Sequence, residues 1–381
     1  MTTVDHPTLF TPRMPAHQSA LKKLRSDVSV RVIDTYEQQL AELYVIENPA
    51  VIGLPPAELA ARIATYVARS TRRATLEQQG TWAWLPWQRA LVHILPEREF
   101  FLVRTNRNGN LITPKEQQQF YRCVVGVAGL SVGGSIALTL ALQGGARTIR
   151  IADFDSLELS NTNRILAGVH ELATPKTTIV ARRIWEMNPY AHITIFQDGL
   201  TEKNIPSFMR GLDVVVDEMD QMAIKQLIRE QARANKVALV STADNGDTSV
   251  VDVERHDLKK TPYFLGRLGA TSVERFHSMN KLQIIREITR LMGPENVPPR
   301  MQSSLPEIGN TLVSVPQLGG TALMGAAATA YCVHRIAAGL PLPSGRSIIS
   351  LDEKLEHGHA SGAAKNRRAK NTRTFAKNLG L

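Results

Sequence analysis

The 381-residue sequence contains only two cysteines, Cys123 and Cys332. Two thiols are too few for a disulfide-stapled fold or for a zinc site built from cysteines. Their scarcity indicates a reducing compartment, and we expect a cytoplasmic protein. Hydrophobic residues make up 43% of the chain and charged residues 21%, ordinary proportions for a folded protein. The composition therefore excludes a disordered chain, a collagen and a coiled coil.

Long apolar runs are also missing. Residues 1–20 carry Asp5, His6 and Arg13 and have no hydrophobic core of the kind found in signal peptides. The longest apolar stretch, Leu318–Val333, has 16 residues, fewer than the ~20 that span a bilayer. We therefore expect no contact with a membrane and a buried helix of small residues at this stretch.

Acidic residues are absent from the last part of the chain, from Gly358 to Leu381. The formal net charge is +10, and six basic residues in this part supply over half of it: Lys365, Arg367, Arg368, Lys370, Arg373 and Lys377. The segment shows no apolar period, so we expect residues 351–381 to form a disordered basic tail. Such a tail favours solubility, and contact with RNA is the alternative.

Residues 1–100 are predicted to form a mostly helical N-terminal region. Ile33–Ile46 has the pattern of an amphipathic helix, and Pro55-Pro56 is typical of the first turn of a second helix. Three tryptophans at positions 82, 84 and 87 are expected to pack inside this region rather than to bind a ligand. Residues 98–104 read as a strand that leads into the next domain.

Short apolar runs alternate with helical patterns from Tyr121 onward, which indicates an α/β fold with a doubly wound, Rossmann-like, mainly parallel sheet. Residues 101–255 are assigned to this domain and residues 256–350 to its C-terminal part, so the chain has a helical subdomain before the sheet and an extension after it. The expected strands are 122–128, 148–152, 191–196, 212–216, 237–241 and 347–351.

A glycine-rich stretch, GLSVGG, lies between the first of these strands and a helical run. Glycines at such a turn let backbone N–H groups approach a phosphate, and the helix N-terminus favours negative charge. The frame Gly129, Ser131 and Gly134 places Asp153 19 residues after the last glycine, about where an acid would meet a ribose hydroxyl. Because Ser131 replaces the middle glycine, this pattern alone indicates only a nucleotide-binding fold.

A set of polar residues follows the ends of the later strands: Asn161, Asn163, Arg164, Lys176 and Asp220. The carboxyl ends of parallel strands meet at one edge of a sheet, so these side chains can converge. Arg164 and Lys176 suit phosphate oxygens, and Asp220 suits a Mg²⁺ ion that also binds phosphate. These groups favour nucleotidyl transfer over hydride transfer.

These motifs resemble those of the ThiF/MoeB/HesA family, the bacterial relatives of ubiquitin-activating enzymes. The similarity lies in Gly129–Gly134, Asp153–Asp155, Ser160–Arg164, Pro175-Lys176 and Asp217–Asp220. It implies an enzyme that binds ATP and Mg²⁺, adenylates a carboxylate such as the C-terminus of a ubiquitin-like or sulfur-carrier protein, and forms a homodimer.

The resemblance also assigns roles to single residues. Asp153 would bind ribose, Asp220 would hold Mg²⁺, and the phosphates would lie against Asn161, Arg164 and Lys176. Asn163 is grouped with the cofactor-binding residues, and Asp217 is expected only to end its strand. Arg107, in RTNRN, is the candidate for an arginine that contacts ATP across a dimer.

The sequence departs from the family pattern at Ser131, at Ile165 and at Gln221, and it has no paired C-x-x-C motifs. Both cysteines are expected to be buried, so an acyl-adenylate would pass directly to an acceptor. Three other functions stay open: a relative that dehydrates a modified tRNA nucleoside through adenylation, a nicotinamide-dependent oxidoreductase, and a scaffold without activity.

Overall fold

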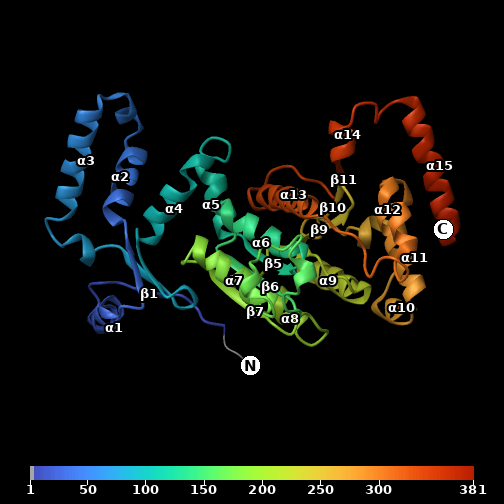
Figure 1. Ribbon diagram of the computed structural model, residues 1–381, viewed down its shortest axis with the longest axis horizontal. Coiled ribbons are helices and arrows are strands. Elements are labelled where there is room, and N and C mark those ends of the chain that lie inside the picture. Colours follow the sequence, from blue (N-terminus) through green and yellow to red (C-terminus); the bar gives the residue numbers. More distant parts are fainter. Residues whose placement is uncertain (1–3) are drawn as a thin grey trace. The chain divides into compact units, whose positions relative to one another are not determined.

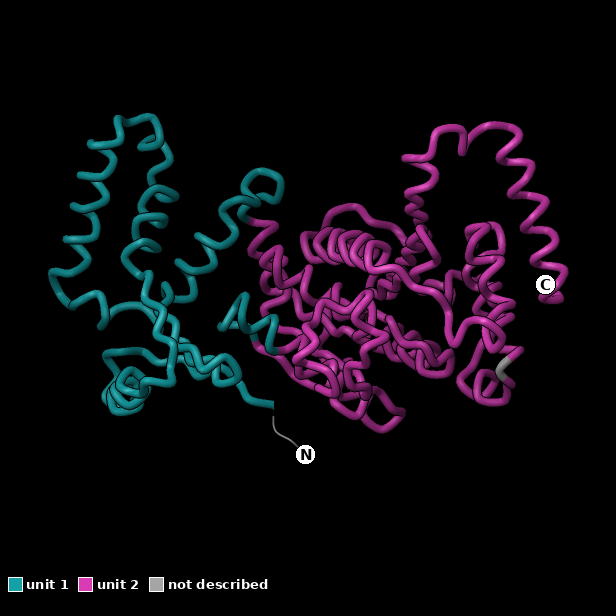
Figure 2. The backbone as a smooth tube through the Cα atoms, in the orientation of Figure 1, with its two compact units in different colours: residues 1–114, 182–191 teal, residues 115–181, 192–381 magenta. Residues whose placement is uncertain are grey.

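The computed structural model describes residues 4–381 and divides the chain into two compact units (Figures 1 and 2). Unit 1 comprises the chain up to residue 114 together with residues 182–191. Unit 2 comprises residues 115–181 and 192–381. Within the described residues, no helix is both long and apolar enough to cross a membrane.

Unit 1 is built on a four-stranded sheet with the order β1-β3-β4-β2. Its strands are β1 (Thr8–Phe10), β2 (Arg31–Asp34), β3 (Thr81–Leu85) and β4 (Ala90–Ile94). Its helices are α1 (Pro15–Ser26), α2 (Tyr36–Glu47), α3 (Pro56–Ser70) and α4 (Glu97–Thr105). Helices make up most of the regular structure of this region, and the four-stranded sheet is the part that the sequence pattern did not predict.

His93, on β4, is fully buried in unit 1 between two aromatic rings. The rings of Tyr36 and Trp82 stack on it, each with its centroid 4.2 Å from the imidazole. Trp82 is a packing residue, as the sequence predicts. The strand expected at residues 98–104 is wrong, because these residues form α4, in which Phe100 and Val103 pack on the apolar side of α2 and α3.

The sheet of unit 2 has seven strands in the order β11-β10-β9-β8-β5-β6-β7. Five of them run parallel: β5 (Val124–Ala128), β6 (Thr148–Ala152), β7 (His192–Phe196), β8 (Val214–Asp217) and β9 (Ala238–Asn245). β10 (Thr248–Glu254) is antiparallel to β9, and β11 (Gly345–Ser350) is antiparallel to β10. The doubly wound, mainly parallel sheet is thus confirmed.

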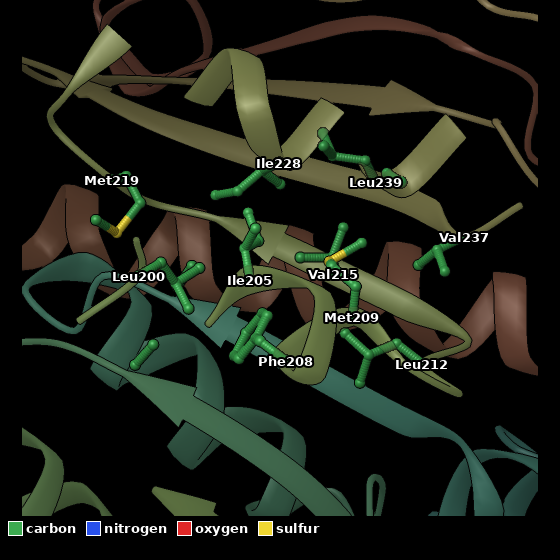
Figure 3. Close-up of a cluster of buried hydrophobic side chains, with 13 residues drawn as sticks. Leu200, Ile205, Phe208, Met209, Leu212, Val215, Met219, Ile228, Val237 and Leu239 are labelled. Carbon is green, nitrogen blue, oxygen red and sulfur yellow. The ribbon is translucent and has the colours of Figure 1, made fainter. Parts of the chain in front are cut away.

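Helices cover both faces of this sheet. α6 (Val132–Leu142) and α13 (Gly319–Ala337) pack together on one face, and α8 (Ile205–Met209) and α9 (Met222–Asn235) pack together on the other. Figure 3 shows the second face, where side chains of α8 and α9 meet Val215 and Leu239 of the sheet. Gly126 on β5 lets α8 approach, since an added Cβ would lie 2.9 Å from Phe208.

The first four parallel strands and β11 lie within two residues of their expected positions. The sequence pattern missed β10 and ended β9 four residues early. The remaining helices of unit 2 are α5 (Pro114–Arg122), α7 (Lys176–Met187), α10 (Val273–His277), α11 (Lys281–Met292), α12 (Pro299–Ser304), α14 (Leu351–Leu355) and α15 (Gly362–Leu379). Two of them cross the boundary between the units, because α5 begins in unit 1 and α7 ends there. The stretch of small residues forms helix α13, which buries one side as expected and leaves Leu323 and Tyr331 exposed on the other.

The basic C-terminal segment is helical, contrary to the expected disorder. α15 buries Phe375 against Val297 and Met301, and Gln302 on α12 donates a hydrogen bond to the Thr372 hydroxyl. Phe375 and Leu379 thus anchor a helix that has few other large apolar side chains, which explains why no apolar period is visible. Five of its six basic side chains are exposed, and Arg368 is half-buried.

Candidate functional site

The glycine-rich loop connects β5 to α6 at the carboxyl edge of the parallel strands. Gly129 has a φ of +85°, and a Cβ added there would lie 2.4 Å from the carbonyl oxygen of Glu218. Only glycine fits both the conformation and the close approach of the two chain segments. The Ser131 side chain does not cap α6, and the first N–H groups of a helix and its dipole favour an anion.

Asp153 follows β6 and joins the loop to the next segment. Its Oδ2 accepts a hydrogen bond from the Leu130 N–H at 2.6 Å, and its Oδ1 accepts one from the Asp155 N–H at 2.8 Å. Burial raises the pKa of this carboxyl, and these two hydrogen bonds oppose the rise. The carboxylate oxygens have further lone pairs, so the group can also accept a hydrogen bond from a sugar hydroxyl.

Arg164 lies directly against the loop. Its Nε donates a hydrogen bond to the Ser131 hydroxyl at 3.1 Å, and its Nη1 donates one to the Asn163 Oδ1 at 2.9 Å. Asn163 is itself held by a hydrogen bond from its Nδ2 to the carbonyl of Gln317 at 2.9 Å. The structure therefore brings Ser131, Asn163 and Arg164 together and fixes the guanidinium beside the glycine-rich loop.

Lys176 is the first residue of α7 and is only 6% exposed. Its Nζ donates a hydrogen bond to the Asp155 Oδ2 at 2.8 Å, and its backbone N–H donates one to the Asp155 carbonyl at 2.9 Å. Since the Asp155 N–H bonds to Asp153, the lysine belongs to the same network as the predicted ribose-binding acid. The loop, Asp153, Arg164 and Lys176 thus form one connected group, which we call the loop site.

Asp220 follows β8, two residues after Glu218, whose N–H donates a hydrogen bond to the Ala128 carbonyl at 2.8 Å. This bond places the end of β8 beside the start of the glycine-rich loop. Asp220 is exposed, whereas Asp217 is fully buried and lies 2.6 Å from the Arg229 Nη1. Asp217 is therefore a structural acid at the end of its strand, as expected, and Asp220 is the acid that solvent and ligands can reach.

The donors near the loop suit a metal ion that a nucleotide carries with it. Within residues 4–381, apart from Lys281, no group of three or more His, Cys, Asp or Glu side chains could hold a metal by itself. Magnesium ions are commonly held by one or two carboxylates together with phosphate oxygens. Asp220 fits that pattern.

Two of the predicted cofactor-binding residues have clear packing roles. Gly134 lies in α6, where an added Cβ would lie 3.3 Å from the Val180 side chain of α7, so this glycine serves the contact between two helices. Asn161 is 8% exposed, and its Oδ1 accepts a hydrogen bond from the Glu158 N–H at 3.2 Å, which closes a turn. Whether either one also touches a nucleotide stays a prediction.

Arg107 lies in unit 1, in a short helical turn, Asn106–Asn108, that follows α4. It borders a groove of about 410 Å³ that is lined by residues of α2, α3 and α4, among them Glu42, Val45, Ile63 and Val103. Its predicted contact with ATP across a dimer is not tested by a single chain.

Sequence reasoning missed two acids behind the loop. Glu218 accepts a hydrogen bond at Oε1 from the Thr242 N–H at 2.7 Å, and burial raises the pKa of its carboxyl well above the usual range. Asp244 has both carboxylate oxygens buried without a hydrogen-bond partner among the described residues, and burial raises its pKa to about 6. Asp244 lies beyond residue 241, where the sequence pattern ends this strand. Only a prediction that extended β9 to Asn245 would have placed Asp244 in the sheet.

Both cysteines are buried, as expected. Burial raises the pKa of the Cys123 thiol far above its usual value and that of Cys332 to about 11. A thiol attacks as its thiolate, so the burial of both cysteines disfavours a role as nucleophile.

The ThiF family matches residues 105–269 of this chain. An uncharacterized protein of Mycobacterium tuberculosis is 36% identical over 338 residues, which cover 88% of this chain and 44% of that protein. The tRNA threonylcarbamoyladenosine dehydratase of Escherichia coli is 30% identical over 142 residues, 36% of this chain and 52% of that enzyme.

A third relative is the sulfur carrier protein ThiS adenylyltransferase of Escherichia coli, which is 30% identical over 124 residues, 32% of this chain and 48% of that enzyme. The chain thus spans about half the length of these curated relatives. The two enzymes match a third of the chain, whereas the mycobacterial relative matches most of it, so the similarity to that relative extends beyond the ThiF region.

Proposed function

Because residues 105–269 form a ThiF family domain, we propose that this protein uses ATP to adenylate a carboxylate. The observation that carries the proposal is the loop site, in which a glycine-rich turn, a buried acid and two cations form one hydrogen-bonded network. An adenylyltransferase among the relatives supports the same activity.

In the proposed reaction a carboxylate oxygen of the substrate attacks the α-phosphorus of ATP. A bond forms between that oxygen and phosphorus, the bond to the bridging oxygen breaks, and pyrophosphate leaves. Arg164 and Lys176 stabilise the negative charge that develops on the phosphate oxygens, and the N–H groups at the start of α6 orient them. Asp153 accepts a hydrogen bond from the ribose, so most of the rate enhancement comes from alignment.

We assign the Mg²⁺ ion to Asp220, which is the exposed acid at the end of β8. When bound, this ion neutralises phosphate charge. Asp217 holds the strand end in place through its ion pair with Arg229, so the loop that carries Asp220 starts from a fixed point.

The proposed substrate is the C-terminus of a small ubiquitin-like or sulfur-carrier protein, a peptide or a small acid. The sulfur-carrier adenylyltransferase among the relatives supports a protein C-terminus. Because the Cys123 and Cys332 thiols are buried and carry raised pKa values, the adenylate would be transferred directly to an acceptor. We further propose a cytoplasmic homodimer, and the exposed apolar side chains of Leu323 and Tyr331 on α13 offer it a contact surface.

The test is calorimetry of ATP binding with Mg²⁺, followed by ATP–pyrophosphate exchange with candidate carboxylates. Asp220→Ala should weaken ATP binding and abolish exchange, whereas Asp198→Ala, which removes another exposed acid of unit 2, should change neither. Full exchange in Asp220→Ala would refute the role of Asp220. No ATP binding by the wild type would favour a scaffold without activity.

A second candidate is adenylation of a modified tRNA nucleoside, because a relative is a tRNA threonylcarbamoyladenosine dehydratase and the exposed face of α15 is basic. Replacing Lys365, Arg367, Lys370 and Arg373 by Gln removes four of the six positive charges and keeps the Phe375 anchor. Tight tRNA binding that weakens steeply with salt and is lost in this variant would support the candidate. Equal tRNA binding by the wild type and by this variant would exclude a role of α15 in tRNA binding.

A further inference from the structure

A cavity of about 560 Å³ lies in unit 2 at the end of β10, and its lining is rich in cations. Because β10 is antiparallel to β9, this end lies at the edge of the sheet opposite to the glycine-rich loop. We call it the basic cavity, and its polar lining consists of Lys259, Lys260, Thr261, Arg267, Ser344 and Arg346. The proposed adenylation does not use it.

No acidic side chain lines the basic cavity. Three acids that precede Lys259 in the sequence are already paired: Asp252 with Arg346 at 2.5 Å, Glu254 with Arg229 at 2.8 Å, and Asp257 with Arg255 at 2.7 Å. The side chains of Lys259, Lys260 and Arg267 are exposed, and no ion pair to any of them occurs among the described residues. The mouth of the cavity therefore carries three positive charges that a ligand can neutralise.

Two hydroxyl groups lie in the lining beside these cations. Thr261 is only 2% exposed, and its Oγ1 lies 3.1 Å from the Ser344 Oγ. The Ser344 Oγ also accepts a hydrogen bond from the Arg255 N–H at 2.9 Å, so a main-chain group fixes its position. Lysine and arginine cations together with hydroxyl donors are the groups that bind phosphate oxygens.

The segment that carries the cations is held in one conformation. Phe264 and Leu265 have φ angles of 51° and 55°, which non-glycine residues adopt only under constraint. The constraint is visible, since the Phe264 N–H donates a hydrogen bond to the buried Glu254 Oε2 at 3.2 Å and the Phe264 ring lies under the Arg229 guanidinium. The backbone that carries these cations therefore needs little ordering when a ligand binds.

We propose that the basic cavity is a second ligand site, which binds a small phosphate-bearing anion. Lys259, Lys260 and Arg267 neutralise the phosphate, and Ser344 donates a hydrogen bond to one of its oxygens while it accepts one from the Thr261 hydroxyl. The cavity is open and carries no pattern for a base or sugar, so the recognised part of the ligand is the phosphate itself.

The experiment uses the full chain with Arg164→Ala/Lys176→Ala, which disables the loop site, and inorganic pyrophosphate as the probe in calorimetry. The cavity variant carries Lys259→Ala/Lys260→Ala/Arg267→Ala in addition to these two substitutions. It should bind pyrophosphate at least tenfold more weakly than the protein with the loop-site substitutions alone. The matched control, Arg122→Ala/Lys203→Ala/Arg210→Ala, removes three exposed cations of unit 2 that lie elsewhere and should leave binding intact. All three cavity residues are exposed, so the variant should fold normally.

Equal binding in the cavity variant, or an equal loss in the control, would overturn the proposal, because either result would mean that only net charge matters. A parallel titration with AMP separates two sources of the phosphate. Tighter binding of AMP than of inorganic phosphate would identify a nucleotide as the ligand, and the reverse order would identify a free phosphate. Both orders support the site, provided that the cavity variant loses the binding.

Discussion

The Ser131 hydroxyl accepts a hydrogen bond from the Nε of Arg164 at 3.1 Å. Ser131 stands where glycine would complete the G-x-G-x-x-G pattern, so the residue that breaks the pattern is also the one that orients the arginine. With a side chain at this position, the loop backbone approaches a phosphate less closely. In return, the hydroxyl holds a cation in place beside the loop. This relationship links two motifs that lie 33 residues apart in the sequence.

Ser131→Ala should therefore weaken ATP binding. A single hydrogen bond contributes about 0.5–1.5 kcal/mol, which corresponds to roughly a 2- to 12-fold higher Kd in calorimetry. The matched control is Ser160→Ala: its hydroxyl bonds only Glu158, and Arg164 reaches its backbone carbonyl. An unchanged Kd in Ser131→Ala would mean that Arg164 needs no partner on the loop.

Gly129→Ala should disrupt the loop site, because the residue has a positive φ and a new Cβ would collide with the Glu218 backbone. A left-handed conformation alone costs roughly 1–2 kcal/mol for a residue with a Cβ, and the collision adds to it. We expect a lower melting temperature and loss of ATP binding. Gly320→Ala, on α13 with nothing within 4 Å of the new Cβ, should keep both, and similar effects in the two variants would contradict this explanation.

Arg229→Met should destabilise the sheet of unit 2. Arg229 bridges Asp217 at 2.6 Å and Glu254 at 2.8 Å, and both acids are fully buried. Removing one partner of a buried ion pair costs about 3–5 kcal/mol, because charge is left unpaired. Hydrogen exchange of the β8 and β9 amides should accelerate accordingly. Arg210→Met, at an exposed arginine of the same unit, should leave these rates unchanged, and a slow exchange in Arg229→Met would refute the role of the pair.

Asp244 should make stability depend on pH. Burial raises its pKa to about 6, whereas an aspartate in an unfolded chain has a value of about 3.9. The folded state therefore holds the proton more tightly, and the free energy of unfolding falls as pH rises from about 4 to 6. At 1.36 kcal/mol for each pKa unit, the loss amounts to at most roughly 3 kcal/mol.

Asp244→Asn should remove this contribution, so that the variant melts at a higher temperature than the wild type at pH 8 and at nearly the same temperature at pH 4. Calorimetric scans across that range give the comparison. Asp198→Asn, at an exposed acid, should follow the wild-type curve. Parallel curves for Asp244→Asn and the wild type would show that Asp244 ionises normally.

The parallel strands and the loop site were predictable because local patterns determine them. Short, mostly apolar segments such as 148–152 are typical of buried parallel strands, and the motif residues follow those strands directly. β10 was not predictable, because Asp252 and Glu254 interrupt its apolar pattern, and the partners that make these acids acceptable inside, Arg346 and Arg229, are distant in the sequence.

The same reason explains the errors at both ends of the chain. α15 depends on the packing of Phe375 against Val297 and Met301. No apolar periodicity in the local sequence indicates this contact. The sheet of unit 1 depends on the pairing of β1 with β3 and of β2 with β4, which joins segments more than 50 residues apart. Tertiary contacts therefore override weak local preferences in these regions.

The ion pair between Lys176 and Asp155 has a consequence for how the loop site meets a phosphate. An exposed lysine would have to shed its water and lose its rotational freedom when the ligand arrives. Lys176 is already dehydrated and aimed, since it is 6% exposed and bonded at 2.8 Å. An incoming phosphate therefore competes with the Asp155 carboxylate for a cation that is already in position. This competition lowers the affinity for the phosphate, and the fixed position of the cation makes binding faster and its geometry more precise.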